Sequence, residues 1–148
     1  MREIRLILII TMALLIIAAC SPNTQEMNNP LVTPPAEPEE GMATVTGRVI
    51  SEDSGLPLSD TIIRLAEVVR QEEEAAYVLD VAFSPGADSD GEGFFIFENV
   101  DPIEYVIIVG DPYENYKVIV AEDGKAKTWT TVDGQILNVG ELIVDLSP

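Results

Sequence analysis

The chain has 148 residues, no histidine, one cysteine and a formal net charge of −18 at pH 7. A single cysteine cannot form an intrachain disulfide, and without histidine a zinc site of the Cys/His type has no ligands. Because so negative a charge repels phosphate backbones, nucleic acid is excluded as a partner.

Residues 1–19 have the composition of a secretory signal peptide. Arg2 and Arg5 form a short basic region, and residues 6–19 are almost entirely apolar. This apolar run is shorter than the ~20 residues that a helix needs to span a bilayer. A basic region followed by a short apolar run is typical of a signal peptide, so we expect one over residues 1–19.

The signal peptide ends in Leu15-Ile16-Ile17-Ala18-Ala19-Cys20, which resembles the lipobox of bacterial lipoproteins. The resemblance implies a diacylglyceryl group on the sulfur of Cys20, cleavage just before it, and an acyl chain such as palmitate on the new amino terminus. Two or three acyl chains hold a protein on a membrane where one does not. We therefore expect lipid attachment at Cys20, on the extracytoplasmic side of the cell membrane, or at the outer membrane if the organism has one.

Residues 20–42 are predicted to be the lipidated cysteine followed by a disordered, proline-rich tether. Five prolines lie in this segment, and few of its residues could join a core: Pro22, Pro30, Pro34, Pro35 and Pro38. Proline lacks a backbone donor and favours extended chain. The tether is therefore expected to hold the following domain away from the lipid headgroups.

Residues 43–148 read as one all-β domain, a sandwich of short strands separated by turns. The runs rich in β-branched and aromatic residues are 43–50, 61–69, 75–83, 94–100, 104–110, 116–121, 126–132 and 136–146. The segment 62–78 is ambiguous, because its apolar residues would also fit one face of a helix. Its β-branched residues favour two strands joined at the acidic tip Glu72-Glu73-Glu74.

Two segments, 46–65 and 88–109, are similar to carboxypeptidase regulatory-like domains of the transthyretin-like (prealbumin-like) group. The matching residues are Gly47, Val49, Gly55-Leu56-Pro57-Leu58, Asp88, Asp90-Gly91, Phe95, Phe97, Asn99-Val100, Pro102 and Tyr105. Gly93 and Ile103 depart from the pattern, since Gly93 lies one residue beyond the usual turn and Ile103 replaces a common glycine. The resemblance implies a seven-stranded Greek-key β-sandwich with a binding or accessory role and no catalytic residues.

The turn "DSDGEG" offers a weak calcium site at Asp88, Asp90 and Glu92, with Gly93 at the sixth position of the loop. The twelfth position is Asn99, which lacks the bidentate carboxylate of a calcium loop. A hairpin turn without metal is therefore the favoured interpretation, and no cofactor is predicted.

Trp129, Tyr113 and Tyr116 are candidate ligand-binding residues, because exposed aromatic rings could stack on a sugar or a protein partner. The alternative is that Trp129 belongs to the core or covers it, which is more usual in a small sandwich. We expect a non-catalytic binding module at the cell surface, with an envelope protein or a glycan as partner. The alternatives are a purely structural envelope component and a carbohydrate-binding domain that uses Trp129.

Overall fold

The computed structural model describes residues 34–72 and 74–147, and the compact unit to which they belong begins at Pro34. The predicted signal peptide, Cys20 and the tether up to residue 33 lie outside the described residues. None of the described residues forms a helix long and apolar enough to cross a membrane.

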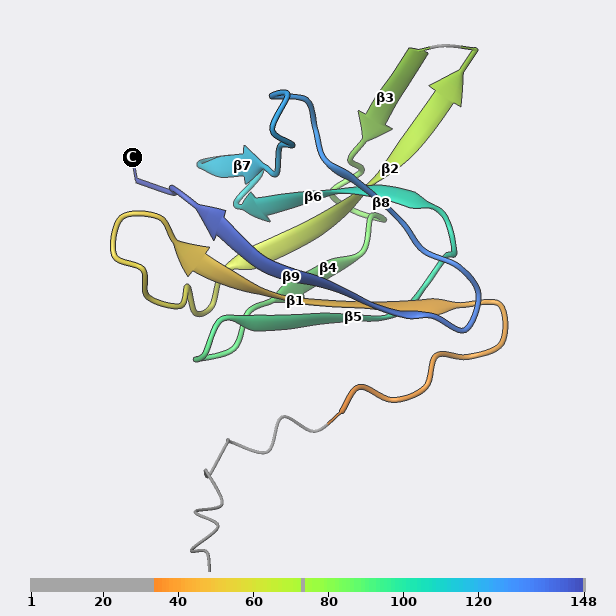
Figure 1. Cartoon of the computed structure of the whole chain (residues 1–148), viewed down its shortest axis with the longest axis horizontal. Helices are drawn as coiled ribbons and strands as arrows, with labels where there is room; N and C mark the ends of the chain where they lie inside the picture. Colours follow the sequence, from red (N-terminus) through yellow and green to blue (C-terminus); the bar gives the residue numbers. More distant parts are fainter. Residues whose placement is uncertain (1–33, 73, 148) are drawn as a thin grey trace, which may run out of the picture. The chain divides into compact units, whose positions relative to one another are not determined.

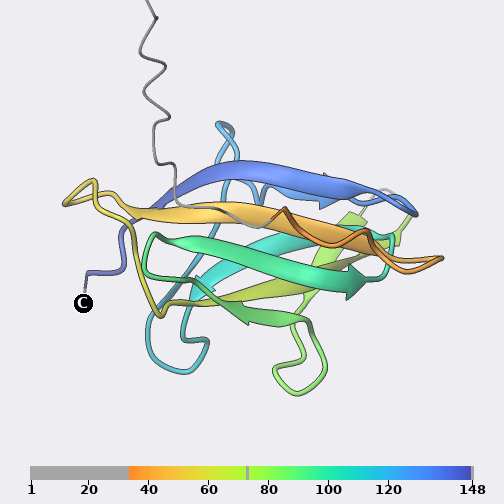
Figure 2. The ribbon, with the colours of Figure 1, turned by 90° about the horizontal axis from the view of Figure 1, so that it is seen from below.

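Nine strands within the described residues form two sheets that face one another, which confirms the all-β prediction for this part of the chain (Figures 1 and 2). The smaller sheet has three strands in the order β5-β1-β9. The larger sheet has six strands, with the path β3-β2-β6-β7, and with β4 beside β2 and β8 beside β6. The bounds are β1 Ala43–Ser51, β2 Ile62–Gln71, β3 Glu74–Val78, β4 Gly86–Asp88, β5 Phe94–Val100, β6 Glu104–Gly110, β7 Tyr116–Val118, β8 Thr128–Thr130 and β9 Ile136–Val144.

The ambiguous segment 62–78 forms two strands, β2 and β3, as the sequence favoured. The strand count differs from the expected seven, because two edge positions of the larger sheet are each shared by two short strands. β3 and β4 both pair with β2, and β7 and β8 both pair with β6. The loops 79–85 and 119–127 interrupt these positions.

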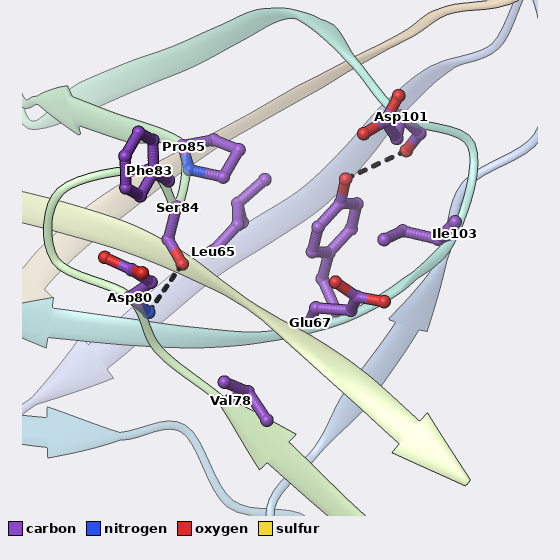
Figure 3. A pocket seen from close by; sticks show the side chains of 10 residues that line it. Leu65, Glu67, Val78, Asp80, Phe83, Ser84, Pro85, Asp101 and Ile103 are labelled. Atoms are coloured by element: carbon purple, nitrogen blue, oxygen red, sulfur yellow. Dashed lines mark hydrogen bonds between the residues drawn. The ribbon is translucent and has the colours of Figure 1, made fainter.

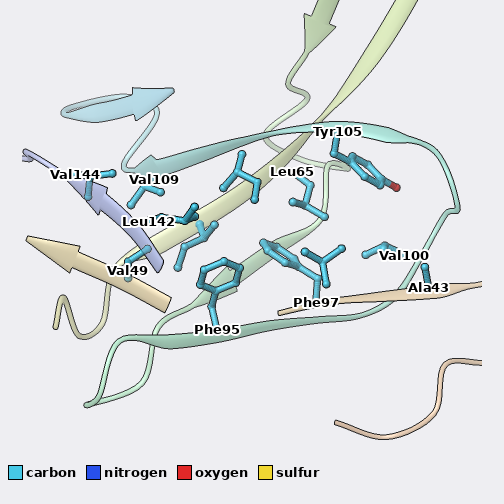
Figure 4. Packing of buried hydrophobic residues seen from close by; sticks show 13 residues of the cluster. Ala43, Val49, Leu65, Phe95, Phe97, Val100, Tyr105, Val109, Leu142 and Val144 are labelled. Carbon is cyan, nitrogen blue, oxygen red and sulfur yellow. The ribbon is translucent and has the colours of Figure 1, made fainter. Parts of the chain in front are cut away.

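The main core lies between the two sheets, and most of its residues alternate along their strands, except at the irregularity between β1 and β5 that brings in Val100 (Figure 4). Its members come from both sheets: Ala43, Val45, Val49, Ile63, Leu65, Phe95, Phe97, Val100, Tyr105, Ile107, Val109, Leu142 and Val144. Full burial of each large aliphatic side chain contributes roughly 1.5–3 kcal/mol. Gly47 leaves room for this packing, because a Cβ there would lie 2.6 Å from the ring of Phe95.

β6 is buried on both faces, because the outer face of the larger sheet carries a second cluster. Ala66, Val106 and Ile108 form this cluster, and Leu79 and Ala126 of the interrupting loops pack against it. The two loops therefore cover the middle of the outer face, which leaves the β2–β3 hairpin as the part of the sheet without such a cover.

The last part of the predicted tether, residues 34–42, is attached to the small sheet. The backbone N–H of Glu39 donates to Oδ1 of Asn99 at 2.9 Å, and that of Gly41 donates to Oδ1 of Asp133 at 2.8 Å. Residues 39 and 41, just before the first strand, are therefore hydrogen-bonded to the sandwich.

Candidate functional site

The β2–β3 hairpin extends beyond the strands of the smaller sheet at one end of the sandwich (Figure 1). Cross-strand pairing places four side chains in one row across the larger sheet: Val78 opposite Glu67, Glu67 opposite Tyr105, and Tyr105 opposite Trp129. Directly paired residues of antiparallel strands share a face. Tyr105 belongs to the main core, so the whole row lies on the face of the larger sheet that is turned toward the smaller sheet.

A pocket of about 230 Å³ lies beside this row, between the hairpin, the loop after β3 and the loop between β5 and β6 (Figure 3). Ten residues line it: Leu65, Glu67, Val78, Asp80, Phe83, Ser84, Pro85, Asp101, Ile103 and Tyr105. The lining is apolar at its base, where Leu65 and Tyr105 come from the core. Its volume is below that of a typical drug-sized site, so it suits one side chain or a small molecule.

One wall is the loop 79–85, which Asp80 organises. Its carboxylate Oδ1 accepts the backbone N–H of Ala82 at 2.9 Å, and its own N–H donates to Oγ of Ser84 at 3.0 Å. Its carbonyl oxygen also accepts the N–H groups of Phe83 and Ser84. This tight turn leaves the side chain of Phe83 87% exposed at the rim of the pocket.

The opposite wall is held by the carbonyl oxygen of Asp101. It accepts the hydroxyl of Tyr105 at 3.0 Å, the N–H of Ile103 at 2.9 Å and the hydroxyl of Thr131 at 3.1 Å. Thr131 is itself buried. The backbone at Asp101 is therefore fixed, and its side chain lines the pocket from a rigid support.

The pocket is electrically negative. Glu67, Asp80 and Asp101 line it, and none of its ten lining residues is Lys, Arg or His. Burial, and then the charges of Asp101 and Glu67, raise the pKa of the Tyr105 phenol to about 12. Arg70 of the same hairpin does not compensate this charge, because its guanidinium binds both carboxylate oxygens of Glu104, at 2.7 and 2.8 Å.

The three aromatic residues predicted as a platform do not come together. Trp129 is partly buried against the main core, and Lys127 Nζ lies 4.9 Å from the centre of its ring. Tyr116 is opposite Gly110, whereas Trp129 is opposite Tyr105 at the other end of β6, roughly 17 Å away at the rise of a strand. Tyr113 is 81% exposed in the loop between β6 and β7. Trp129 adjoins the pocket through Tyr105 but does not line it.

The turn 88–93 is organised by its own hydrogen bonds. Oδ1 of Asp90 accepts the backbone N–H groups of Glu92 and Phe94, both at 2.9 Å. Asp88, Asp90 and Glu92 do not form a cluster able to hold a metal ion, and no such cluster of three or more ligand side chains occurs among the described residues. Gly93 is required because its φ is +82° and a Cβ would lie 2.5 Å from the carbonyl oxygen of Val49.

Several pocket residues, among them Asp80, Phe83 and Asp101, were not predicted from the sequence to form a site. A signal was present in "DVAFSPG", where an acidic residue and a proline flank an apolar stretch. That pattern predicts a break in a strand, with an apolar residue at the break. It does not predict which other loop lies opposite. The predicted lipid attachment residue, Cys20, lies outside the described residues.

No known sequence family and no curated protein matches this chain. Among solved structures, it is similar to a Pseudomonas aeruginosa protein described as a candidate carbohydrate-binding protein, with 18% identity, a TM-score of 0.46, and 74% of this chain and 92% of that one covered. It is also similar to the dioxygenase domain of a dioxygenase–carbohydrate-binding fusion from Streptomyces sp. SirexAA-E, with 13% identity, a TM-score of 0.43 and coverage of 82% and 97%.

A third similar structure is the pilus 2b backbone protein of group B Streptococcus, with 15% identity and a TM-score of 0.37. This likeness covers 69% of the present chain and 39% of the pilus protein. All three TM-scores are below 0.5, so these likenesses identify no function for this chain.

Proposed function

We propose that this chain is a lipid-anchored, non-catalytic binding module outside the cytoplasm, and that its pocket receives a positively charged group. The observation that carries this proposal is the lining of the pocket, where Glu67, Asp80 and Asp101 surround an apolar base with no cation among them. An ammonium or guanidinium group would form charge-assisted hydrogen bonds with these carboxylates and offset part of their negative charge. The exposed ring of Phe83 would add a cation–π contact at the rim.

A non-catalytic role fits the chemistry of the pocket. The chain has no histidine. The hydroxyl of Ser84 in the pocket wall accepts the N–H of Asp80, and among the described residues it makes no hydrogen bond to a carboxylate. Acid–base or nucleophilic catalysis depends on such a partner within hydrogen-bond reach. The three carboxylates therefore serve binding in this proposal.

The anchoring part of the proposal rests on the lipobox at Cys20. Mass spectrometry of the membrane-extracted protein should show an acylated Cys20 as the first residue. The variant Cys20→Ser should lose the acyl groups and keep its leader or leave the membrane. An unmodified Cys20 on an uncut chain would overturn this part of the proposal.

We also propose that the domain has the prealbumin-like Greek-key plan of seven strand positions. Support comes from the shared edge positions, since counting β3 with β4 and β7 with β8 gives seven. The hydrogen bond from the Tyr105 hydroxyl to the carbonyl of Asp101 resembles the tyrosine corner of Greek-key sandwiches.

The pocket can be tested with N-acetyl-lysine methylamide, a compound with one free ammonium group and no charged ends. Binding to the full chain in a non-ionic detergent would be followed by calorimetry in moderate salt. We expect the variant Glu67→Gln/Asp80→Asn/Asp101→Asn to weaken binding about tenfold or more, because each lost charge-assisted contact costs roughly 1 kcal/mol or more. Asn at position 80 keeps an oxygen for the N–H of Ala82.

A matched control removes the same number of charges from exposed sites away from the pocket, as Glu98→Gln/Glu114→Gln/Glu122→Gln. This control should bind the lysine compound within about twofold of the parent chain. Equal binding by the two triple variants would show that net charge alone attracts the compound, which would overturn the pocket. Binding of uncharged sugars instead, sensitive to Trp129→Ala, would favour the glycan alternative.

A further inference from the structure

The outer edge of β3 is an exposed sheet edge. β3 is the last strand in the path β3-β2-β6-β7, and the strand it pairs with is β2. All five of its residues are exposed, and the hairpin projects beyond the small sheet (Figure 1). Unpaired strand edges can bind further strands unless they are protected by short length, charged side chains (lysine above all), proline, bulges or a cover; the one charged residue of β3 is Glu74. The segment 62–78 contains neither lysine nor proline.

Exposed apolar side chains accompany this edge on both faces of the hairpin. Val69 is 47% exposed, Tyr77 44% and Val78 52%. Tyr77 is opposite Val68, while Val69 lies on the other face opposite Ala76. A hairpin whose only role was to be a solvated turn would not need these side chains, whereas a strand added at the edge would pack against them.

The edge is continuous with the pocket, because Val78 is both the last residue of β3 and part of the pocket lining. A strand lies about 4.8 Å from its neighbour and turns alternate side chains to the same face. A strand beside β3 would therefore direct every second side chain to the face that contains the pocket, on the side of Val78 and Glu67.

The charge of this region selects the kind of strand. Glu72 and Glu74 flank the tip, and Glu67 and Asp80 line the adjoining pocket. Arg70 is bound to Glu104 and Arg64 donates to the carbonyl of Ser84, and neither forms an ion pair with these carboxylates. A second copy of the chain brings its own net charge of −18 and is repelled, whereas a segment with lysine or arginine at alternate positions is attracted.

We infer that the ligand of this domain is an extended basic segment of another protein, which adds to the larger sheet as a strand beside β3 and places one lysine or arginine side chain in the pocket. This inference rests on the proposed function, since it names the molecule that carries the charged group. Backbone hydrogen bonds along β3 would give the affinity, and the pocket would select the basic side chain.

The test uses the full chain in a non-ionic detergent and an acetylated, amidated peptide of four Thr-Lys repeats, with binding followed by fluorescence anisotropy in moderate salt. Two isomers of this peptide carry N-methyl groups, one on every threonine amide and the other on every lysine amide. Successive amides point to opposite edges of a strand, so each isomer blocks one edge and keeps all charges. We expect one isomer to bind at least about tenfold more weakly than the other.

Two protein variants locate the contact. Ala75→Pro and Ala76→Pro each remove one N–H from adjacent positions of β3, one facing β2 and the other facing outward. The outward variant should keep its melting temperature and lose peptide binding. The methylated peptides provide the same test on the unaltered protein, should either variant fail to fold.

The outcomes separate this inference from the proposed function. Equal binding of the two methylated isomers, or a peptide affinity no higher than that of the single lysine compound, would overturn strand addition and leave the pocket standing. Binding of the lysine compound that is unaffected by the pocket variant would overturn the proposed function. Concentration-dependent dimers that the outward proline variant abolishes would show that the edge binds a second copy, against the inference.

Discussion

Replacing Tyr105 by Phe removes one hydroxyl from the wall of the pocket and provides a measurable test of that wall. Tyr105 is 3% exposed, and its hydroxyl donates to the carbonyl of Asp101 at 3.0 Å. That carbonyl keeps the N–H of Ile103 and the hydroxyl of Thr131, so no acceptor is left unpaired. The variant should therefore lose only the net value of one hydrogen bond, about 1 kcal/mol at pH 7.

The same substitution should change the response to alkali. The pKa of Tyr105 is raised from 10.0 to about 12 in the folded chain, so folding holds the phenolic proton more tightly than the unfolded state does. The stability that this proton contributes is fully present below pH 10 and is lost as the pH rises toward 12. At about 1.4 kcal/mol for each unit of pKa, the loss approaches roughly 2–3 kcal/mol and is near half of that at pH 11.

Urea unfolding from pH 7 to pH 11.5 would measure both effects, with the parent chain and Tyr105→Phe compared at each pH. The parent should be more stable by about 1 kcal/mol at pH 7, and the two stabilities should meet near pH 11. Lysine titration affects both proteins and cancels in the difference. A constant difference across the whole range would refute the claim that burial and the two carboxylates shift this phenol.

Three further substitutions test the structure around the sandwich. Gly93→Ala should lower the free energy of unfolding by about 2 kcal/mol or more, because its φ is +82° and a Cβ would contact the carbonyl oxygen of Val49. Gly91→Ala is the control, since a Cβ there meets open space, and similar melting temperatures for the two variants would contradict this prediction. Ser89→Ala should lower the free energy of unfolding in urea by roughly 2–3 kcal/mol, because the buried hydroxyl donates to the carbonyl of Leu58 at 2.6 Å and accepts the N–H of Thr61 at 3.0 Å. A loss below about 0.5 kcal/mol would argue against those two hydrogen bonds. Asp90→Ala should lower the melting temperature while Asp90→Asn, which keeps the accepting oxygen, should not. Calcium should leave the melting temperature of the parent unchanged, and a calcium-dependent rise would restore the metal site.

The strands formed by short apolar runs between turn residues were predictable from the sequence. β5 and β6 begin and end at the predicted residues, because each is a run rich in aromatic or β-branched residues that is flanked by clear turn residues. The run 75–83 was predicted too long. Val81 and Phe83 favour a strand, but Asp80 bonds through its carbonyl and its carboxylate to the residues that follow and turns the chain.

The pocket was not predictable in the same way, because it depends on strand register. Glu67 and Tyr105 are far apart in the sequence and meet only through the pairing of β2 with β6. Asp80 and Asp101 then lie on two loops that this pairing brings to the same end of the sandwich. The sequence patterns indicate which residues face inward, but they contain no information on which loops become neighbours.

The parallel pairing of β1 with β9 has a consequence for how the chain acquires its structure. β1 is the central strand of the smaller sheet, and the register joins Thr44 to Ile136 and Ser51 to Val144. During synthesis, the first strand therefore keeps an unfilled hydrogen-bonding edge until the last strand has been made. Contacts so distant in sequence form slowly. The smaller sheet is thus expected to form only after residues 136–144 have been synthesised.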